Sequence, residues 1–163
     1  MGGDPLARVY ELYSREIFAY LCVLSGDSSL AEDIMQETFL KAILSLNESH
    51  GNVRAWLYTV ARNLFLDRAR RAGCETPVEE PPEGTVKGPE EVLQEKIVKD
   101  ELRSALMRLD KRKREVIMLQ YYSGLSVREI ASLMNLSQEN VRVLAYRAKK
   151  ELKKYLEEVN EIQ

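Results

Sequence analysis

Residues 123 to 150 read SGLSVREIASLMNLSQENVRVLAYRAKK, and their spacing predicts two short helices joined by a tight turn. Ser126 and Glu129 have the spacing of a capping box, which starts the first helix. Asn135 tolerates the left-handed backbone that ends a helix, and Ser137 can cap the second helix by accepting hydrogen bonds from its free amides. This stretch therefore predicts a helix-turn-helix, a hairpin that reads duplex DNA.

The second helix of this hairpin has an apolar side and a basic side. At about 100° per residue, Val141, Leu144, Ala145 and Ala148 fall together and are expected to be buried. An ordinary helical hairpin with a solvated charged face is the alternative, and the coincidence of cap, turn and apolar spacing favours DNA binding over it. The residues expected to contact duplex DNA are Ser137, Gln138, Glu139, Asn140, Arg142, Val143, Tyr146, Arg147, Lys149 and Lys150.

Charge is segregated along the chain, although its 163 residues sum to a formal net charge of only -2. Residues 53 to 73 carry 5 basic side chains against 1 acidic, and residues 103 to 155 carry 13 against 5. Between them, residues 74 to 102 carry 3 basic side chains against 9 acidic ones. Local potential decides where phosphates bind, so two nucleic-acid contacts are expected. Charge pairing within the molecule remains the alternative.

Helical spacing of apolar residues throughout predicts an all-α fold of two small domains joined by a flexible acidic linker. Residues 1 to 72 are expected to hold three packed helices, and Ile34, Phe39 and Ile43 are expected to point inward from the second. Residues 73 to 89 form the linker, because prolines and glycines among glutamates cannot build a core. Residues 90 to 163 form the second domain, which ends in the helix-turn-helix.

Several classes of protein are disfavoured by what the sequence lacks. No apolar run approaches the roughly 20 residues of a membrane span, so a cytoplasmic protein without membrane insertion is expected. Cys22, Cys74 and His50 are too few and too scattered for a zinc site. Motifs for metalloproteases, phosphate-binding loops and Ser-His-Asp hydrolases are absent. We therefore expect neither an enzyme nor a bound metal or cofactor.

The third predicted helix carries a second candidate surface. Arg54, Tyr58, Arg62 and Phe65 lie within about 80° of arc, facing away from the expected buried stripe. Unpaired bases stack on exposed rings at roughly 1 to 3 kcal/mol per base, while arginines hold the backbone, so this face suits a melted DNA strand. Packing of the two rings within the protein is the alternative. The buried stripe is expected to be Val53, Trp56, Leu57, Val60, Ala61 and Leu64.

This organisation resembles the extracytoplasmic-function (ECF) sigma factors of the sigma-70 family. The similar stretches are AEDIMQETFLKA at 31 to 42, RAWLYTVARNLFLDRARR at 54 to 71 and REVIMLQYYSGLSVREIASLMNLSQENVR at 114 to 142. The resemblance implies a factor that directs core RNA polymerase to specific promoters and melts the DNA there. Residues 1 to 72 would correspond to sigma region 2 and residues 90 to 163 to region 4.

The resemblance also implies roles for individual residues. The second helix would dock on the clamp helices of the largest polymerase subunit through Asp33, Gln36, Glu37, Phe39 and Lys41. The second domain would read the minus-thirty-five element as duplex, and an anti-sigma factor is a further implied partner. Residues 47 to 52 and the third helix would hold the melted minus-ten strand, with Arg54, Trp56, Tyr58, Arg62, Asn63, Phe65, Arg68, Arg70 and Arg71 as its contacts.

Two departures and two rival functions qualify the resemblance. Many relatives have a basic residue at the position of Leu144 and Leu-Pro at Leu109 and Asp110, so details of promoter sequence are not carried over. A stand-alone helix-turn-helix regulator would bind duplex DNA without polymerase, usually as a dimer. A helical adaptor without DNA binding would be indifferent to DNA sequence.

Overall fold

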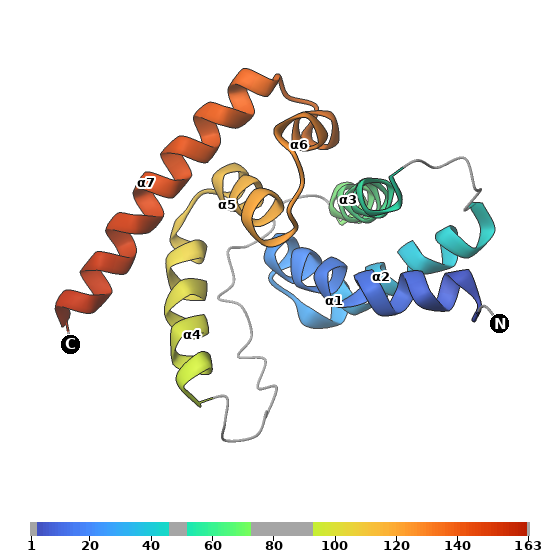
Figure 1. Cartoon of the computed structure of the whole chain (residues 1–163), viewed down its shortest axis with the longest axis horizontal. Helices are drawn as coiled ribbons and strands as arrows, with labels where there is room; N and C mark the ends of the chain where they lie inside the picture. The colour runs from blue at the N-terminus through green and yellow to red at the C-terminus, as the bar shows by residue number, and fades with distance from the viewer. Residues whose placement is uncertain (1–2, 46–51, 73–92, 163) are drawn as a thin grey trace. The chain divides into compact units, whose positions relative to one another are not determined.

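The computed structural model describes residues 3–45, 52–72 and 93–162, and every element in these ranges is a helix (Figure 1). The chain divides into two compact units, Met1–Gly84 and Thr85–Gln163. The predicted linker over residues 73 to 89 lies outside the described residues.

Unit 1 consists of α1 (Pro5–Ser25), α2 (Ser28–Ser45) and α3 (Val53–Arg71). Proline is favoured in the first turn of α1, and the Asp4 carboxylate caps that turn by accepting from the Leu6 amide at 3.1 Å. Gly26 ends α1 at φ 69°, a left-handed conformation that glycine adopts without steric cost. Asn52 caps α3 by accepting from the Ala55 amide at 3.1 Å. Unit 1 thus has the three helices expected within residues 1 to 72.

The core of unit 1 lies where the three helices meet. Ile17 and Leu21 from α1, Ile34 from α2 and Leu57 from α3 are fully buried. The buried Thr38 hydroxyl donates to the Ile34 carbonyl at 2.7 Å, so this polar group is satisfied inside the core. Each helix packs against both of the others. The buried surface of a helix in this arrangement is therefore wider than one stripe.

Several burial predictions for unit 1 are wrong for reasons that follow from this packing. Tyr58, expected to be exposed, is fully buried, because α3 is covered on one side by α1 as well as by α2. Its ring packs edge-to-face on Tyr20 with centroids 5.0 Å apart, so the alternative of internal packing holds for this residue. Ile43, expected to be inward, is 57% exposed near the end of α2. Three members of the predicted α3 stripe are only half-buried: Val53, Trp56 and Val60.

Unit 2 consists of α4 (Leu93–Arg108), α5 (Lys111–Ile117), a π-helical turn η2 (Met118–Tyr122), α6 (Val127–Met134) and α7 (Gln138–Ile162). Asp110 caps α5 by accepting from the Lys113 amide at 3.0 Å, and this hydrogen bond lowers the pKa of the carboxyl. The π-helical turn was not predicted, since its wider hydrogen bond, from the Ser123 amide to the Met118 carbonyl at 3.0 Å, has no sequence signature.

Arg114 ties the end of α4 to α5. Its guanidinium donates to the carbonyls of Leu106, Met107 and Leu109 at 3.0, 3.0 and 2.9 Å. Carbonyls at the end of a helix lack their usual backbone partners, so the guanidinium satisfies groups that water would otherwise solvate, although the Leu106 carbonyl also accepts from the Leu109 amide at 3.1 Å. Burial lowers the pKa of Arg114 from its usual value. Nearby, Leu109 packs with Ile117 and Ala148, which joins α5 to α7.

Candidate nucleic-acid and polymerase interfaces

The turn between α6 and α7 has the geometry that the sequence predicts. The Glu129 amide donates to Ser126 Oγ at 3.1 Å and the Ser126 amide donates to Glu129 Oε1 at 2.9 Å, which completes the capping box. Asn135 ends α6 at φ 57° and ψ 47°, in the left-handed region. Ser137 Oγ accepts from the Asn140 amide at 3.0 Å and so caps α7. The helix-turn-helix is confirmed at each of these positions.

The apolar side of the hairpin fixes how α7 crosses α6. Ile130 and Val141 are fully buried, and Ala131 and Ala145 are nearly so, which allows close approach of the two helices. Leu144, expected to be buried with them, is half-buried. The packing leaves the opposite side of α7 in solvent.

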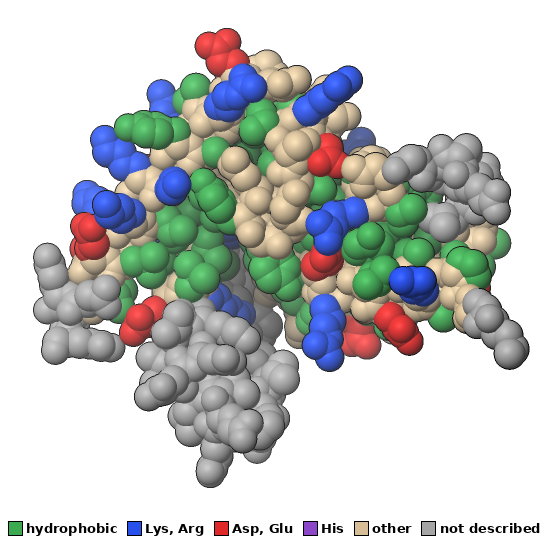
Figure 2. All heavy atoms as spheres, viewed as in Figure 1, with side chains coloured by type: hydrophobic (Ala, Val, Ile, Leu, Met, Phe, Trp, Pro, Cys, Tyr) green, Lys and Arg blue, Asp and Glu red, His purple; other side chains and the backbone are tan. Residues whose placement is uncertain are grey.

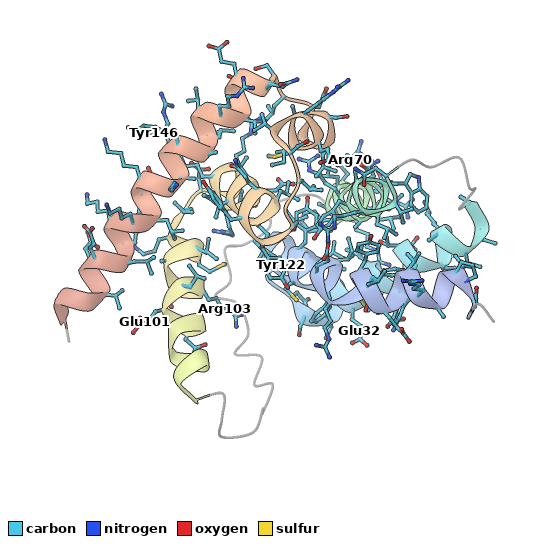
Figure 3. All side chains as sticks on the ribbon, viewed as in Figure 1. Glu32, Arg70, Glu101, Arg103, Tyr122 and Tyr146 are labelled. Carbon is cyan, nitrogen blue, oxygen red and sulfur yellow. The ribbon has the colours of Figure 1, made fainter. Side chains whose placement is uncertain are left out.

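All ten residues expected to contact duplex DNA are exposed on this side or at the start of α7: Ser137, Gln138, Glu139, Asn140, Arg142, Val143, Tyr146, Arg147, Lys149 and Lys150. Tyr146 is 69% exposed and projects from α7 away from α5 and α6 (Figure 3). Figure 2 shows arginine and lysine side chains along the same helix. Within the described part of unit 2, none of its cations on this face pairs with a carboxylate, although the Lys149 ammonium lies 5.5 Å from the Tyr121 ring centroid.

Other cations of unit 2 are paired inside the unit. Lys113 Nζ lies 2.9 Å from Glu151 Oε1, and this hydrogen bond raises the pKa of the lysine. Arg108 Nη1 lies 3.0 Å from Glu158 Oε2, and its guanidinium also covers the Tyr155 ring at 4.0 Å. Charge pairing within the molecule thus accounts for these basic residues. It does not account for the basic face of α7.

On α3, by contrast, several of the candidate DNA contacts themselves form ion pairs within the molecule. Arg54 Nε lies 3.1 Å from Glu16 Oε1 of α1, and Arg68 Nη2 lies 3.0 Å from Glu37 Oε2 of α2. Arg70 pairs with Asp67 at 2.8 Å within α3. The exposed candidates on α3 are Asn63, Arg70 and Arg71, and the half-buried ones are Arg54, Trp56, Arg62, Phe65 and Arg68.

Glu16 is the centre of a network that the sequence pattern did not reveal. The Tyr58 hydroxyl donates to Glu16 Oε1 at 3.3 Å, and the Arg54 guanidinium covers the Tyr13 ring at 5.4 Å. Burial raises the pKa of the Glu16 carboxyl, and Arg54 and the Tyr58 hydroxyl offset part of that rise. An acidic side chain on an amphipathic helix is usually solvated, so only the partner helix identifies this one as internal.

The outer face of α2 differs from expectation at its second half. Asp33, Gln36 and Lys41 are exposed as expected, and Glu37 is half-buried in its ion pair with Arg68. Phe39 is 7% exposed and packs edge-to-face on Tyr10, with centroids 5.0 Å apart. It agrees with the inward prediction and leaves no ring surface for a partner.

Three apolar residues on the same outer face were missed. Leu40 is 57% exposed, Ile43 57% and Leu44 78%. They follow Gln36 at i+4, i+7 and i+8, the helical spacing that places residues on one side. That spacing is the sequence pattern from which an exposed apolar patch on α2 could have been predicted.

Some expectations fall where the structure makes no description. Of residues 47 to 52, expected to hold the melted minus-ten strand together with the third helix, residues 47 to 51 lie outside the described residues. In the described ranges no group of three or more His, Cys, Asp or Glu side chains is arranged to hold a metal ion. Across those same ranges, no helix combines the length and apolar character that crossing a membrane requires.

One unit of this helical chain carries a DNA-reading helix-turn-helix. The other carries the basic helix α3, packed on α2, whose outer face is acidic and apolar. Together these features define a two-domain transcription factor. Residues 9–74 match the family model of sigma-70 region 2, and residues 99–152 match that of sigma-70 region 4. The chain belongs to the ECF sigma factors of the sigma-70 family. It directs core RNA polymerase to specific promoters and initiates transcription there by recognising and melting the DNA.

Similar proteins are found among both sequences and structures. The ECF RNA polymerase sigma factor SigM of Bacillus subtilis (strain 168) is 30% identical over 151 residues, which cover 89% of this chain and 91% of the relative. The RNA polymerase sigma factor YlaC of the same strain is 32% identical, covering 93% of this chain and 91% of the relative. The sigma factor RpoE of Bartonella quintana, solved in complex with the anti-sigma factor NepR, gives a TM-score of 0.70 at 25% identity, covering 93% of this chain and 96% of that chain.

Proposed function

We propose that α7 reads the minus-thirty-five element by placing its capped start in the major groove. Recognition helices contact base edges with their first residues, which here include Glu139 and Arg142. Arg147, Lys149 and Lys150 lie further along the same exposed face and would meet phosphates. The observation that carries this proposal is the exposed basic face of α7, whose cations have no carboxylate partner in the described residues.

Binding of holoenzyme to promoter variants at several salt concentrations tests these assignments. Replacing Lys150 with Gln should weaken binding to all sequences and reduce the slope of log K against log salt by about 0.9, the value of one duplex phosphate contact. Arg142→Ala should change the preference among minus-thirty-five sequences. If Arg142→Ala weakens every sequence equally, its assignment as a base contact is wrong.

We propose further that the outer face of α2 docks on the clamp helices of the largest polymerase subunit. Asp33, Gln36 and Lys41 would make the polar contacts, with Glu37 contributing beside its ion pair. Leu40, Ile43 and Leu44 support this proposal, because adjacent exposed apolar side chains mark interaction surfaces. Phe39 would act from beneath by shaping α2, since its ring is buried against Tyr10.

A pair of matched leucines tests the docking proposal. Leu44→Gln should lower the affinity for core polymerase by about tenfold or more, since burial of a leucine side chain contributes about 1.5 to 3 kcal/mol. Leu12→Gln is the control, because Leu12 is also an exposed leucine, at 58%, and lies on α1. Equal affinities of the two variants in a core-binding titration would refute the proposed face.

We propose that α3 holds the melted minus-ten strand with its exposed and half-buried polar and aromatic residues. Asn63, Arg70 and Arg71 are exposed, while Trp56 and Phe65 keep part of each ring available for stacking. Arg62 and Arg68 would add phosphate contacts, the latter after partial exchange of its pair with Glu37. Tyr58 is excluded from base stacking by its burial.

The decisive experiment is run-off transcription with core polymerase on a genomic fragment library, with and without this chain. Start sites that appear only with the chain, together with permanganate-reactive thymines upstream of them, are the expected result. Polymerase would supply the catalysis, and this chain no chemical step. An absence of reactive thymines at every start site would refute the proposed role in strand separation.

The partner set extends to regulation and location. We propose that an anti-sigma factor sequesters this chain, supported by the RpoE relative, which was solved with its anti-sigma factor NepR. Because polymerase and promoter DNA are its partners, the proposed site of action is the cytoplasm. To test sequestration by an anti-sigma factor, the chain is purified from native cells. A second protein that is retained through purification is identified by mass spectrometry and released before transcription is measured.

A further inference from the structure

The start of α3 is held by a carboxylate that comes from another helix. Glu16 of α1 has an 18% exposed side chain, and Arg54 in the first turn of α3 has a 39% exposed one. The two lie 3.1 Å apart between Nε and Oε1, and a second contact joins Arg54 Nη2 to Glu16 Oε2 at 3.4 Å. Both carboxylate oxygens are therefore directed at one guanidinium.

The guanidinium is also engaged on its face. Its central carbon lies 5.4 Å from the centroid of the Tyr13 ring, at a distance where a cation is attracted to the π system. A DNA phosphate that binds Arg54 would compete with Glu16 for the charge of the guanidinium and with the Tyr13 ring for its face. In the free protein this cation is thus balanced by an internal anion, and it adds little positive potential to the surface of α3.

A second hydrogen bond extends the network one turn further along α3. The Tyr58 hydroxyl donates to the same Glu16 oxygen at 3.3 Å, and the buried Tyr58 ring packs on Tyr20 of α1 at 5.0 Å. Residues 54 and 58 are one turn apart, so Glu16 contacts the first two turns of α3 from one side. Trp56 lies between these anchors in the sequence.

The other end of α3 has the opposite electrostatic character. Arg71 is exposed, and in the described residues no carboxylate lies within ion-pair distance of it. Among the described residues, the exposed Arg70 pairs with Asp67, three positions earlier in the same helix, a kind of pair that contributes little in water. Positive charge available to phosphates is therefore concentrated at the end of α3.

We propose that Glu16 is a masking and positioning residue of the strand-binding surface: it keeps Arg54 off the DNA and fixes the first two turns of α3 through Tyr58. Phosphates of the melted strand are then held at the end of α3, while its start presents a rigid, electrically neutral edge to the bases. This inference rests on the proposed strand-binding role of α3.

The salt dependence of strand binding tests the masking role. Holoenzyme is titrated with a single-stranded minus-ten oligonucleotide between about 50 and 200 mM salt, where one extra phosphate contact steepens the slope by about 0.7. Glu16→Gln, which frees Arg54, should steepen the slope by that amount, so that affinity falls about 2.5-fold more across this range than in the wild type. Glu11→Gln is the matched control, because Glu11 is an exposed glutamate on the same helix.

Variants of Arg54 complete the test. Arg54→Gln alone should leave the slope unchanged, and Arg54→Gln combined with Glu16→Gln should cancel the steepening. A decrease of about 0.7 for Arg54→Gln alone shows that Arg54 already contacts a phosphate, which overturns the proposal. Equal slopes for the Glu16 and Glu11 variants overturn it as well. If Glu16→Gln fails to fold, Arg54→Gln alone still decides.

A measurement without DNA separates this inference from the proposed function. In the free chain, hydrogen exchange at Arg54 Nη2, which donates to Glu16 Oε2 at 3.4 Å, should be slow in the wild type and about tenfold or more faster in Glu16→Gln, with Glu11→Gln unchanged. Fast exchange in the wild type refutes the proposed contact between Glu16 and Arg54. If exchange is slow but wild-type holoenzyme does not bind the single strand, the strand-binding role of α3 is refuted, and the masking role of Glu16 with it. The contact between Glu16 and Arg54 is then still supported.

Discussion

Replacing Arg114 with Met should destabilise unit 2 selectively. The variant removes three hydrogen bonds of 2.9 to 3.0 Å to the carbonyls of Leu106, Met107 and Leu109 while keeping most of the apolar stem. Hydrogen bonds from a charged donor contribute about 1.5 to 3 kcal/mol each, but these three share one side chain, and carbonyls at a helix end turn partly to water. We therefore expect a total loss of about 2 to 3 kcal/mol in the free energy of unfolding.

The chain contains an internal control for this measurement. Trp56 is its single tryptophan and lies in unit 1, so tryptophan fluorescence follows unfolding of that unit, whereas far-UV circular dichroism follows both. In thermal unfolding the transition of unit 2 should shift down by on the order of 10 to 20 °C, with the fluorescence transition unchanged. Arg112→Met, at an exposed neighbouring arginine, should shift neither transition.

Two results would refute the reasoning about Arg114. A loss no greater than that of Arg112→Met would show that water replaces the guanidinium at no cost. Full stability of Arg114→Lys would show that positive charge alone suffices, since one ammonium cannot reach three carbonyls in this fork geometry.

Three further predictions concern stability and its dependence on pH. Asp110→Ala should cost about 1 kcal/mol of folding stability by removing the cap of α5. Because the folded pKa of Asp110 is lowered, this contribution is present above the ordinary Asp pKa of 3.8 and is lost as pH falls through the folded pKa. Urea unfolding at a series of pH values measures this loss. Asn135→Ala should cost about 1 to 2 kcal/mol, because φ is 57° there, whereas Asn135→Gly should cost less; thermal unfolding compares the two. Because the folded pKa of Glu16 is raised, the contribution of this side chain to folding stability is largest below the ordinary Glu pKa of 4.5 and is lost as pH rises through the folded pKa. In the same urea series, Glu16→Gln should abolish this dependence of stability on pH, whereas Glu11→Gln should retain it.

The helix-turn-helix was predictable because its determinants are local. The capping box at Ser126, the left-handed Asn135 and the cap at Ser137 each depend on residues within a few positions in the chain. The exposed face of α7 was predictable for the same reason, since α6 covers only the side that the apolar spacing marks. Periodicity thus predicted both the hairpin and its solvent-facing residues.

The surface of α3 was only partly predictable because its environment is non-local. One stripe describes a helix that packs on one neighbour, but α3 packs on both α1 and α2, and Tyr58 is buried in the additional contact. The pairing of Arg54 with Glu16 joins residues 38 positions apart, and no spacing rule relates them. The error at Ile43 has the opposite cause, because the end of α2 leaves it uncovered.

The π-helical turn at Met118–Tyr122 affects the direction of everything that follows it. A hydrogen-bonded ring with one residue more than an α-helical ring rotates the subsequent backbone by about 100°. Gly124, at φ 69°, then turns the chain toward Ser126, where the hairpin begins. A one-codon deletion within these five residues would therefore shift the chain that leads into α6 by one residue against α7, which packs on α4 and α5, and would remove none of the DNA-facing side chains. We expect such a deletion to change the preferred promoter spacing without changing the bases that are recognised.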